Sequence, residues 1–248
     1  MKTVLITGCS SGFGLETAKY FLDRDWTVIA TMRTPRDDVL PSSAHLKLLQ
    51  LDVTDADSIR RAVEAAGPVD VLVNNAGVGM LGPFESTSMD AVREVFETNT
   101  FGTMAVTQAL LPQFRARKAG VVINVASSVT LTSLPLLPVY TASKAAIVAF
   151  TASLALELKE FNIRVGVVLP GMAPETPFAS NAHARVTQSF PDDYAPTMQA
   201  VLSGFQNYDG PVTHAADVAE VIWQAVHDSA TAFRVPAGAD AIEWFKRG

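Results

Sequence analysis

Short apolar runs that favour β-strands alternate with helical patterns along most of the chain, and this order limits the possible folds. The β-rich runs cover residues 3–7, 27–31, 46–51, 69–73, 120–125, 164–169 and 232–235. The helical patterns cover residues 15–24, 55–65, 88–117, 145–158 and 214–228. Strands that alternate with helices predict a parallel sheet, because each helix carries the chain back to start the next strand. We therefore predict an α/β fold with one domain, residues 1–248, and a doubly wound parallel sheet of about seven strands.

The composition indicates an ordinary globular protein, with 48% apolar and 18% charged residues. The net charge of −6, without a cluster of Lys or Arg, argues against a nucleic acid or an anionic membrane as partner. The single cysteine, Cys9, excludes an internal disulfide framework and a cysteine-based zinc site. The apolar runs are shorter than a membrane span of ~20 residues, and the N-terminal one is too short for a signal peptide. We expect a soluble, cytoplasmic protein without a metal site.

A glycine-rich turn follows the first predicted strand directly. Gly8, Gly12 and Gly14 have the spacing G-x-x-x-G-x-G, and the helical pattern starts at Leu15. Glycines permit a tight turn, and the N-terminus of the following helix presents backbone N–H groups that bind a phosphate. The order of strand, glycine turn and helix predicts a dinucleotide site. A purely structural turn is the alternative.

The same turn contains a second pattern. Residues 8–12 match G-x-S-x-G, the nucleophile elbow of serine hydrolases, with Ser10 as the nucleophile. That elbow needs an oxyanion-hole N–H group from an upstream strand connection, and only one strand precedes Ser10 here. His214 and Asp209 lie downstream without a matching context. We keep a serine hydrolase as a minor alternative.

The end of the second predicted strand bears on the choice of cofactor. A carboxylate that would bind the ribose 2′-hydroxyl of NAD(H) is missing there, and Met32 and Arg33 stand in its place, with Arg36 nearby. A guanidinium pairs well with a 2′-phosphate, so the sequence favours NADP(H). Asp37 and Asp38 keep NAD(H) possible, and two solvated arginines in a turn are the alternative.

Tyr140 and Lys144 have the spacing that puts two side chains on one face of a helix. A tyrosine pKa near 10 must fall to about 7 for acid–base work at neutral pH, and a lysine charge about 5 Å away supplies much of that shift. The pair is therefore predicted to be a tuned proton donor, and a surface pair is the alternative. Ser127 closes the fifth strand, 13 positions before Tyr140.

Two further polar positions stand out. Asn74 and Asn75, with Ala76 and Gly77 behind them, follow the fourth strand, at the edge where open α/β sheets bind ligands. Asn99 lies in the middle of the helical segment 88–117, which we expect Pro112 to bend or end. An exposed polar residue is the alternative for Asn99.

Two loops are predicted to form the substrate side. Residues 131–138 are rich in Leu and Pro, and residues 172–213 have little regularity, which predicts a mobile substrate lid with short helices. The expected lining is apolar and carries no cation for a carboxylate or phosphate. We therefore predict a hydrophobic ketone or alcohol as substrate. The lining is predicted to include Leu131, Leu134, Leu136, Leu137, Met172 and Phe178.

With these motifs in order, nearly the whole chain resembles the short-chain dehydrogenase/reductase family, which has a Rossmann-like fold. The resemblance rests on six motifs at family-like spacings: T-G-x-x-x-G-x-G from Thr7, N-N-A-G from Asn74, Asn99, Ser127, Y-x-x-x-K from Tyr140, and Pro170-Gly171. It implies a nicotinamide-dependent oxidoreductase of the carbonyl/alcohol class. A protein on this fold that binds NADP without turnover is the main alternative.

The resemblance implies a role for each matching residue. Tyr140 is the expected acid/base, Lys144 lowers its pKa and holds the nicotinamide ribose, Ser127 orients the substrate oxygen, and Asn99 holds a relay water. The cofactor is expected to contact Gly8, Ser10, Ser11, Gly12, Phe13, Gly14, Arg33, Asp52, Val53, Asn75, Ala76, Gly77, Tyr140, Lys144, Pro170, Gly171, Met172 and Thr176. The substrate is expected to contact Ser127, Leu134, Leu137, Tyr140, Met172 and Phe178.

The loop after Pro170 departs from the family pattern. The family commonly places a threonine five residues after this proline, but Glu175 stands there and the threonine is Thr176. A one-residue bulge through Pro174 is needed to restore the cofactor contact. The family also often forms homodimers or homotetramers through paired helices, and the small, apolar surface of 145–158 is compatible with this.

Overall fold

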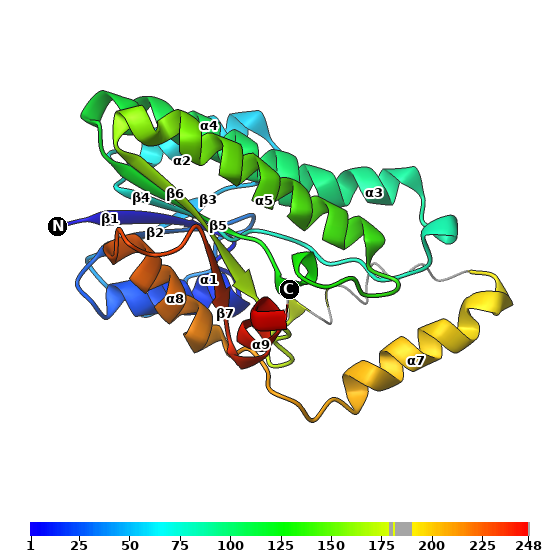
Figure 1. Cartoon of the computed structure of the whole chain (residues 1–248). Helices are drawn as coiled ribbons and strands as arrows, with labels where there is room; N and C mark the ends of the chain where they lie inside the picture. Colours follow the sequence, from blue (N-terminus) through cyan, green and yellow to red (C-terminus); the bar gives the residue numbers. More distant parts are fainter. Residues whose placement is uncertain (179–180, 182–189, 248) are drawn as a thin grey trace.

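The computed structural model describes residues 1–178, 181 and 190–247. In this part of the chain, seven strands form one parallel sheet with the order β3-β2-β1-β4-β5-β6-β7 (Figure 1). The strands are β1 (Thr3–Thr7), β2 (Thr27–Met32), β3 (Leu46–Gln50), β4 (Val71–Asn74), β5 (Gly120–Val125), β6 (Ile163–Pro170) and β7 (Arg234–Ala237). From β1 the chain adds β2 and β3 on one side of the sheet and then β4 to β7 on the other side. The predicted doubly wound parallel sheet is therefore confirmed.

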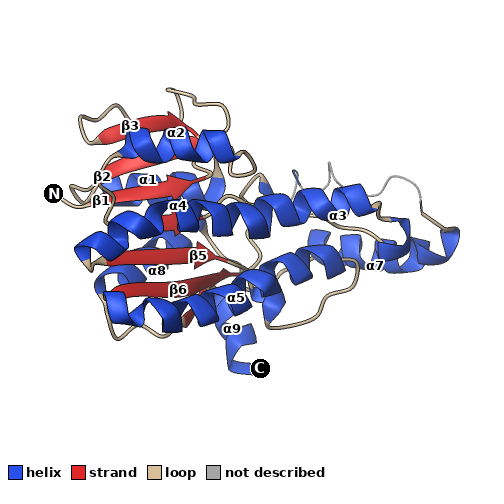
Figure 2. Cartoon of the chain, turned by 90° about the horizontal axis from the view of Figure 1, so that it is seen from above, coloured by secondary structure: helices blue, strands red, loops and turns tan. Residues whose placement is uncertain are grey.

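Helices cover both faces of the sheet. One face carries α1 (Gly12–Leu22) and α8 (Ala215–His227), and the other carries α2 (Ala56–Ala66), α4 (Gly102–Arg117) and α5 (Pro138–Leu158) (Figure 1). The carboxyl ends of all strands point the same way (Figure 2). Beyond that edge lie α3 (Met89–Phe96) and α7 (Ala195–Gln206), and α9 (Ala239–Arg247) follows β7 (Figure 2). A ligand at the carboxyl edge therefore meets both the sheet and these outer helices.

The predicted helix 88–117 is interrupted, but not at Pro112. α3 and α4 are joined by a π-helical turn, η2 (Glu97–Phe101), whereas Pro112 lies inside α4, which continues to Arg117. The expectation that Pro112 bends or ends a helix segment is therefore wrong for the position of the break. A π turn contains one residue more per turn than an α-helix, and it places Asn99 in the wall of the site.

The structure changes the bounds of two predicted elements. α5 starts at Pro138, seven residues before the predicted 145, because proline fits the first turn of a helix, where its missing N–H group has no partner to lose. The C-terminal strand lies at 234–237 instead of 232–235, and the residues after it form a further helix, α9, which no helical pattern in the sequence predicted. Gly238, with a φ of +97°, makes the turn between β7 and α9.

α5, together with the turn that extends it to Phe161, is long and apolar enough to cross a membrane, judged by length and composition alone. In the structure this helix packs against β6, and its buried face carries Tyr140 and Lys144. Among the described residues it is the one helix with such a composition.

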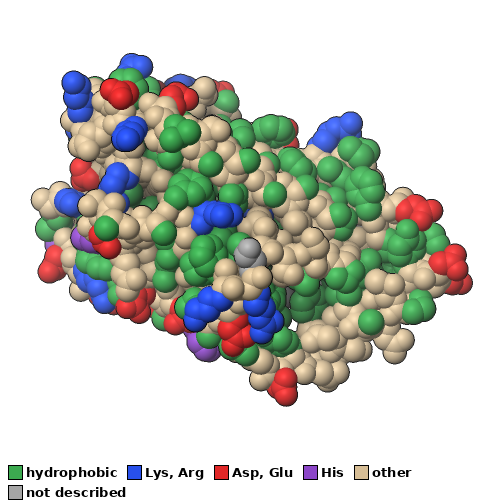
Figure 3. All heavy atoms as spheres, in the orientation of Figure 1, with side chains coloured by type: hydrophobic (Ala, Val, Ile, Leu, Met, Phe, Trp, Pro, Cys, Tyr) green, Lys and Arg blue, Asp and Glu red, His purple; other side chains and the backbone are tan. Residues whose placement is uncertain are grey.

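The lid predicted at 172–213 falls partly outside the described residues, at 179–180 and 182–189. Its described part contains a 3₁₀ turn, η5 (Asp192–Tyr194), and α7. Met198 of α7 is buried against Leu81 and Leu136, with Leu137 and Val201 packed around them. Hydrophobic side chains gather where α7 meets the rest of the molecule (Figure 3). α7 is thereby held over the carboxyl edge by apolar contacts.

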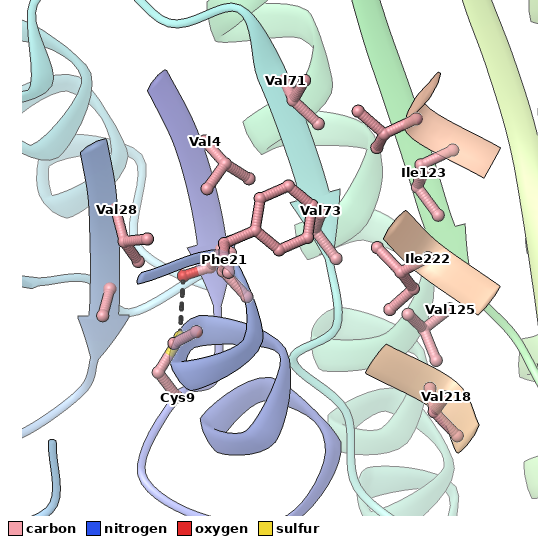
Figure 4. Packing of buried hydrophobic residues seen from close by; sticks show 14 of the residues in the cluster. Val4, Cys9, Phe21, Val28, Val71, Val73, Ile123, Val125, Val218 and Ile222 are labelled. Atoms are coloured by element: carbon pink, nitrogen blue, oxygen red, sulfur yellow. Dashed lines mark hydrogen bonds between the residues drawn. The ribbon is translucent and has the colours of Figure 1, made fainter. Parts of the chain in front are cut away.

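The core is split by the sheet, since alternate residues of each strand face opposite sides. Val4 and Val28 pack with Phe21 of α1 and Ile222 of α8 (Figure 4). On the other face, Leu5, Ile29, Leu72 and Val122 pack with side chains of α2, α4 and α5. Strands buried on both faces read as nearly continuous apolar runs, which is the pattern that the sequence contains.

Candidate active site

The predicted site residues follow the ends of neighbouring strands and so meet at one edge of the sheet. Gly8 follows β1, Asn75 follows β4, Ser127 follows β5 and Gly171 follows β6. The N-terminal half of α5 adds Tyr140 and Lys144. The fold thus brings together motifs that are far apart in the sequence.

Tyr140, Ser127 and Lys144 form a buried group. Tyr140 and Lys144 are 7% and 4% exposed, so the alternative of a surface pair is wrong. Ser127 forms a hydrogen bond with the Tyr140 side chain, and Lys144 Nζ donates to the carbonyl oxygen of Val125 at 3.0 Å. A hydroxyl, a phenol and an amine are thus all buried beside the end of β5.

Burial shifts the pKa values of both titratable groups toward their neutral forms. It raises the pKa of Tyr140 to about 12, with the hydrogen bond from Ser127 acting in the opposite direction. It lowers the pKa of Lys144 to about 8. In the protein alone the pKa of Tyr140 is therefore raised and not lowered as predicted, because desolvation of the phenolate is the largest cause. At neutral pH Tyr140 carries its proton, as a proton donor must.

Asn99 is buried in the π turn and is 1% exposed, so the alternative of an exposed polar residue is wrong. Its amide donates to the Val78 carbonyl oxygen at 2.9 Å and to Ser143 Oγ at 3.0 Å, and its Oδ1 accepts from Val78 N at 2.8 Å. Ser143 in turn donates to the Tyr140 carbonyl oxygen at 2.7 Å. Asn99 therefore links the loop after β4 to the helix turn that carries Tyr140, while its predicted relay water stays a prediction.

Asn75 supports the glycine turn from beneath. Its amide donates to the carbonyl oxygens of Thr7 and Gly8, at 3.0 and 3.1 Å. The Thr7 hydroxyl accepts from the N–H groups of Asn75 and Ala76, both at 3.0 Å. A Cβ on Gly14 would collide with the Asn75 amide and the Gly8 carbonyl oxygen, and Gly8 itself has a φ of +75°. The Asn75 side chain thus shapes the turn, a role beyond the cofactor contact that the resemblance implies for it.

The residues that follow β2 and β3 are those predicted to contact the adenosine part of the cofactor. Arg33 is exposed, and its carbonyl oxygen accepts a hydrogen bond from Gln50. Arg36 Nη2 donates to the carbonyl oxygen of Ser10 at 3.1 Å, so this guanidinium lies against the glycine turn. Asp52 uses Oδ1 to accept from the N–H and hydroxyl of Thr54. Val53 is buried beneath the π turn, against Gly102.

The loop after β6 brings Thr176, and not Glu175, to the glycine turn. Thr176 is buried and donates to the Ala173 carbonyl oxygen at 2.9 Å, and a Cβ on Gly12 would lie 3.6 Å from Thr176 Cβ. Glu175 is exposed and accepts from Ala215 N and His214 Nδ1 at the start of α8. The loop thus places the Thr176 side chain beside the glycine turn, while its contact with the cofactor stays a prediction. For the hydrolase alternative, no hydrogen bond between His214 and Ser10 occurs among the described residues, where His214 pairs with Glu175.

The substrate side is apolar where it is described. The Phe178 ring lies 5.6 Å from the Tyr140 ring, centroid to centroid. Leu137 packs on the cluster of Leu136 and Met198, and Leu134 and Met172 are half-buried. The structure thus brings Phe178 to Tyr140.

A family model described as short chain dehydrogenase matches residues 2–186. The chain belongs to the short-chain dehydrogenase family. Retinol dehydrogenase 8 of Bos taurus is 41% identical to this short-chain dehydrogenase over 182 residues, which are 68% of this chain. The chain spans 58% of the length of that relative. The 3-ketodihydrosphingosine reductase of Bacteroides thetaiotaomicron is 32% identical over 239 residues, 95% of this chain and 87% of that protein.

Solved structures show the same fold. A short-chain dehydrogenase from Streptomyces avermitilis has a TM-score of 0.82 at 32% identity, over 99% of this chain and 91% of that one. A serine dehydrogenase complexed with NADP⁺ has a TM-score of 0.82 at 25% identity, over 96% and 95%. The 3-ketoacyl-(acyl-carrier-protein) reductase from Brucella melitensis, complexed with NADH, has a TM-score of 0.77 at 27% identity, over 95% and 96%.

The glycine turn of this short-chain dehydrogenase fits a dinucleotide phosphate. Gly8 and Gly14 leave no room for a Cβ, so the backbone itself forms the surface of the turn. Ser11, the N-cap of α1, makes no side-chain hydrogen bond to the helix, and the first turn of α1 contains no acidic residue. The first N–H groups of α1 therefore keep their capacity to bind an anion.

Sequence reasoning missed several residues that shape the site of this short-chain dehydrogenase. Thr7 and Ser143 belong to the motifs that carry the resemblance, and their neutral hydroxyls gave no sign of a supporting role. Arg36 was noted beside Arg33 but not assigned to the cofactor site. Asp240 lies outside every predicted element, and its partners are 27 and 68 positions away, so spacing alone gave no signal.

Proposed function

We propose that the protein is a nicotinamide-dependent oxidoreductase, with NADPH favoured, that reduces the carbonyl group of a hydrophobic small molecule or oxidises the corresponding secondary alcohol. The observation that carries this proposal is the buried Tyr140, hydrogen-bonded with Ser127 and one helical turn from Lys144. A surface or structural role would not require an amine and a phenol to lose this much solvent.

The residues divide the chemistry among them. A bound nicotinamide supplies or accepts the hydride at the carbonyl carbon. The Ser127 hydroxyl orients the carbonyl oxygen, and the Tyr140 O–H donates its proton to that oxygen as the C–O double bond becomes a single bond. Lys144, with a pKa of about 8, is mostly protonated at neutral pH and stabilises the resulting Tyr140 phenolate. In the oxidation direction the same proton moves back to Tyr140.

The cofactor would be held by the glycine turn, by the loop after β4 and by residues 170–176. Arg33 follows β2 without a neighbouring acidic residue, and Arg36 lies at the glycine turn, which supports a 2′-phosphate and hence NADPH. Related structures hold NADP⁺ in one case and NADH in another, so the preference rests on these arginines.

The apolar lining supports a hydrophobic substrate. Phe178 lies against Tyr140, and Leu136, Leu137 and Met198 form an apolar cluster under α7. The names of two relatives, retinol dehydrogenase and 3-ketodihydrosphingosine reductase, specify largely apolar substrates. A cytoplasmic location and a homodimeric or homotetrameric assembly remain predictions.

The test is consumption of NADPH with a panel of hydrophobic ketones and aldehydes, in parallel for wild-type protein and Tyr140→Phe. We expect turnover with the wild type and a loss of about 10²–10⁴-fold in Tyr140→Phe. NADPH binding by fluorescence titration should be retained in the variant, because the phenol O–H acts on the substrate. Binding without any turnover would instead identify a non-catalytic cofactor-binding protein. A strong preference for a phosphorylated or acyl-carrier-bound ketone would contradict the hydrophobic substrate.

A further inference from the structure

A buried carboxylate on α9 contacts the loop that follows β6. Asp240 is 1% exposed, and its Oδ2 accepts a hydrogen bond from the backbone N–H of Met172 at 2.6 Å. Its Oδ1 lies 2.6 Å from the hydroxyl of Thr213, which is fully buried. Among the described residues, no ion pair to Asp240 occurs. The carboxylate is therefore held by an amide and a hydroxyl rather than by a cation.

Thr213 completes a connection of three chain segments. Its hydroxyl accepts from Gly171 N at 3.0 Å and lies 2.9 Å from the Ala237 carbonyl oxygen, and its N–H donates to the Met172 carbonyl oxygen at 2.8 Å. Together with Asp240, it binds both N–H groups of residues 171 and 172. The main chain of these two residues therefore has little freedom to move while Asp240 and Thr213 are in place.

Two glycines make this close approach possible. A Cβ on Gly171 would collide with the Asp240 carboxylate, and a Cβ on Gly238 would collide with the Thr213 side chain. Gly238 also has a φ of +97°, which other residues rarely adopt. The carboxylate, the hydroxyl and the two glycines thus form one fitted arrangement, which we call the α9 clamp (Gly171, Met172, Thr213, Gly238 and Asp240).

The α9 clamp acts on a part of the chain that reaches the site. Residues 171 and 172 precede Thr176, whose side chain lies beside Gly12 of the glycine turn, and α9 packs against the 3₁₀ turn η3 (Ser128–Thr130) that follows Ser127. The glycine turn has its own support in Asn75 and Thr7. The clamp and the glycine turn are therefore held by separate sets of hydrogen bonds.

We propose that Asp240 is a positioning residue that fixes the main chain of Gly171 and Met172 for the nicotinamide half of the cofactor. This inference rests on the proposed function. The glycine turn, which would meet the phosphate and adenosine half, is held by Asn75 and Thr7, whereas α9 packs against η3 directly after Ser127, on the side where hydride transfer would occur. Loss of the clamp should therefore weaken the binding of the whole dinucleotide and spare a ligand that lacks the nicotinamide.

The experiment compares two ligands: NADPH, and 2′-phospho-ADP-ribose, which is the same molecule without the nicotinamide ring. Asp240→Ala should weaken NADPH binding about tenfold and change binding of 2′-phospho-ADP-ribose less than about twofold. Asp240→Asn keeps an oxygen for Met172 N and offers an amide to Thr213 Oγ, so it should bind both ligands as the wild type does. Glu243→Ala, an exposed carboxylate on the same helix, is the matched control and should leave both affinities unchanged.

A second variant and a second measurement cover the case in which Asp240→Ala folds poorly. Thr213→Val has the same shape without the hydroxyl, and should show the same selective loss of NADPH affinity. Hydrogen exchange at the Met172 amide should be faster in Asp240→Ala than in Asp240→Asn, because only the asparagine retains an acceptor.

The outcomes separate this inference from the proposed function. An equal loss of both ligands in Asp240→Ala and Thr213→Val would show a general structural role and overturn the positioning role. Unchanged NADPH binding in both variants would overturn it as well. Wild-type protein that binds neither ligand would overturn the proposed function, and the inference would fall with it.

Discussion

The ammonium group of Lys144 lies inside the protein, and among the described residues its one hydrogen-bond acceptor is the Val125 carbonyl oxygen. The same burial that lowers its pKa to about 8 raises that of Tyr140 to about 12. Both shifts favour the neutral form, so the protein alone keeps the phenol protonated and makes the ammonium costly. A phenolate formed by proton transfer would offset that cost, because it pairs with the charge.

The cost of the buried charge predicts that Lys144→Met raises stability while removing activity. In the unfolded chain the lysine pKa is near 10.5, so at pH 7 the shift to about 8 costs on the order of 3 kcal/mol. Loss of the hydrogen bond to Val125 destabilises the variant by about 1–2 kcal/mol and so offsets part of the stability gained by removing the buried charge. We expect a melting temperature about 2–8 °C above wild type at pH 7, measured by scanning calorimetry.

The stability difference between Lys144→Met and the wild type should depend on pH. The unfolded lysine stays protonated up to about pH 10.5, whereas the folded one loses its proton above about pH 8, so the penalty is complete below pH 8 and fades as pH rises toward 10.5. The difference between variant and wild type should shrink over this range. A variant that melts below the wild type at every pH would mean that the buried ammonium stabilises the fold.

Arg33 is expected to select the cofactor. We expect the wild type to bind NADPH at least about tenfold more tightly than NADH, and Arg33→Ala to bind the two cofactors about equally. The reason is that the neutral ribose hydroxyl of NADH gains nothing from the guanidinium. Fluorescence titration with both cofactors measures this difference. Arg93→Ala, an exposed arginine on α3, is the control. Equal binding of NADH and NADPH by the wild type would leave Arg33 as a solvated turn residue and favour oxidation of an alcohol.

At the scale of elements, the glycine turn and the lid helix respond in opposite ways to the same substitution. Gly14→Ala places a Cβ against the Asn75 amide and the Gly8 carbonyl oxygen, and should cost about 1–3 kcal/mol. Gly204→Ala, inside α7 with no atom near the new Cβ, should stabilise by up to about 1 kcal/mol. Urea unfolding of the two variants measures both values. A stable Gly14→Ala would show that Asn75 does not fix the turn.

The elements themselves were largely predictable from the sequence. Alternating apolar runs and helical spacing gave the order of strands and helices, because each depends on neighbours a few residues away. The π turn was not predictable, since its extra residue carries no mark in the sequence and Pro112 pointed to the wrong place for the break. α9 starts directly after Gly238, whose positive φ and close approach to Thr213 exist only in the folded chain.

At the scale of the whole molecule, the site was predictable only where its residues belong to local motifs. The topology brings the glycine turn, Ser127 and the Tyr140–Lys144 pair to one edge, as the strand order requires. Burial was not predictable, and it reversed the expected direction of the Tyr140 pKa. The α9 clamp joins residues 42 and 68 positions apart, and such contacts exist only in the folded chain.

The order of the sheet also has a consequence for how the chain acquires its shape during synthesis. β1 is made first and stands inside the sheet, β2 and β3 are added on one side, and β4 to β7 are then added in turn on the other. Each strand that leaves the ribosome thus finds its partner already made, and the sheet grows outward at its two edges. Because domains form as the chain emerges, no strand has to insert between two that are already paired.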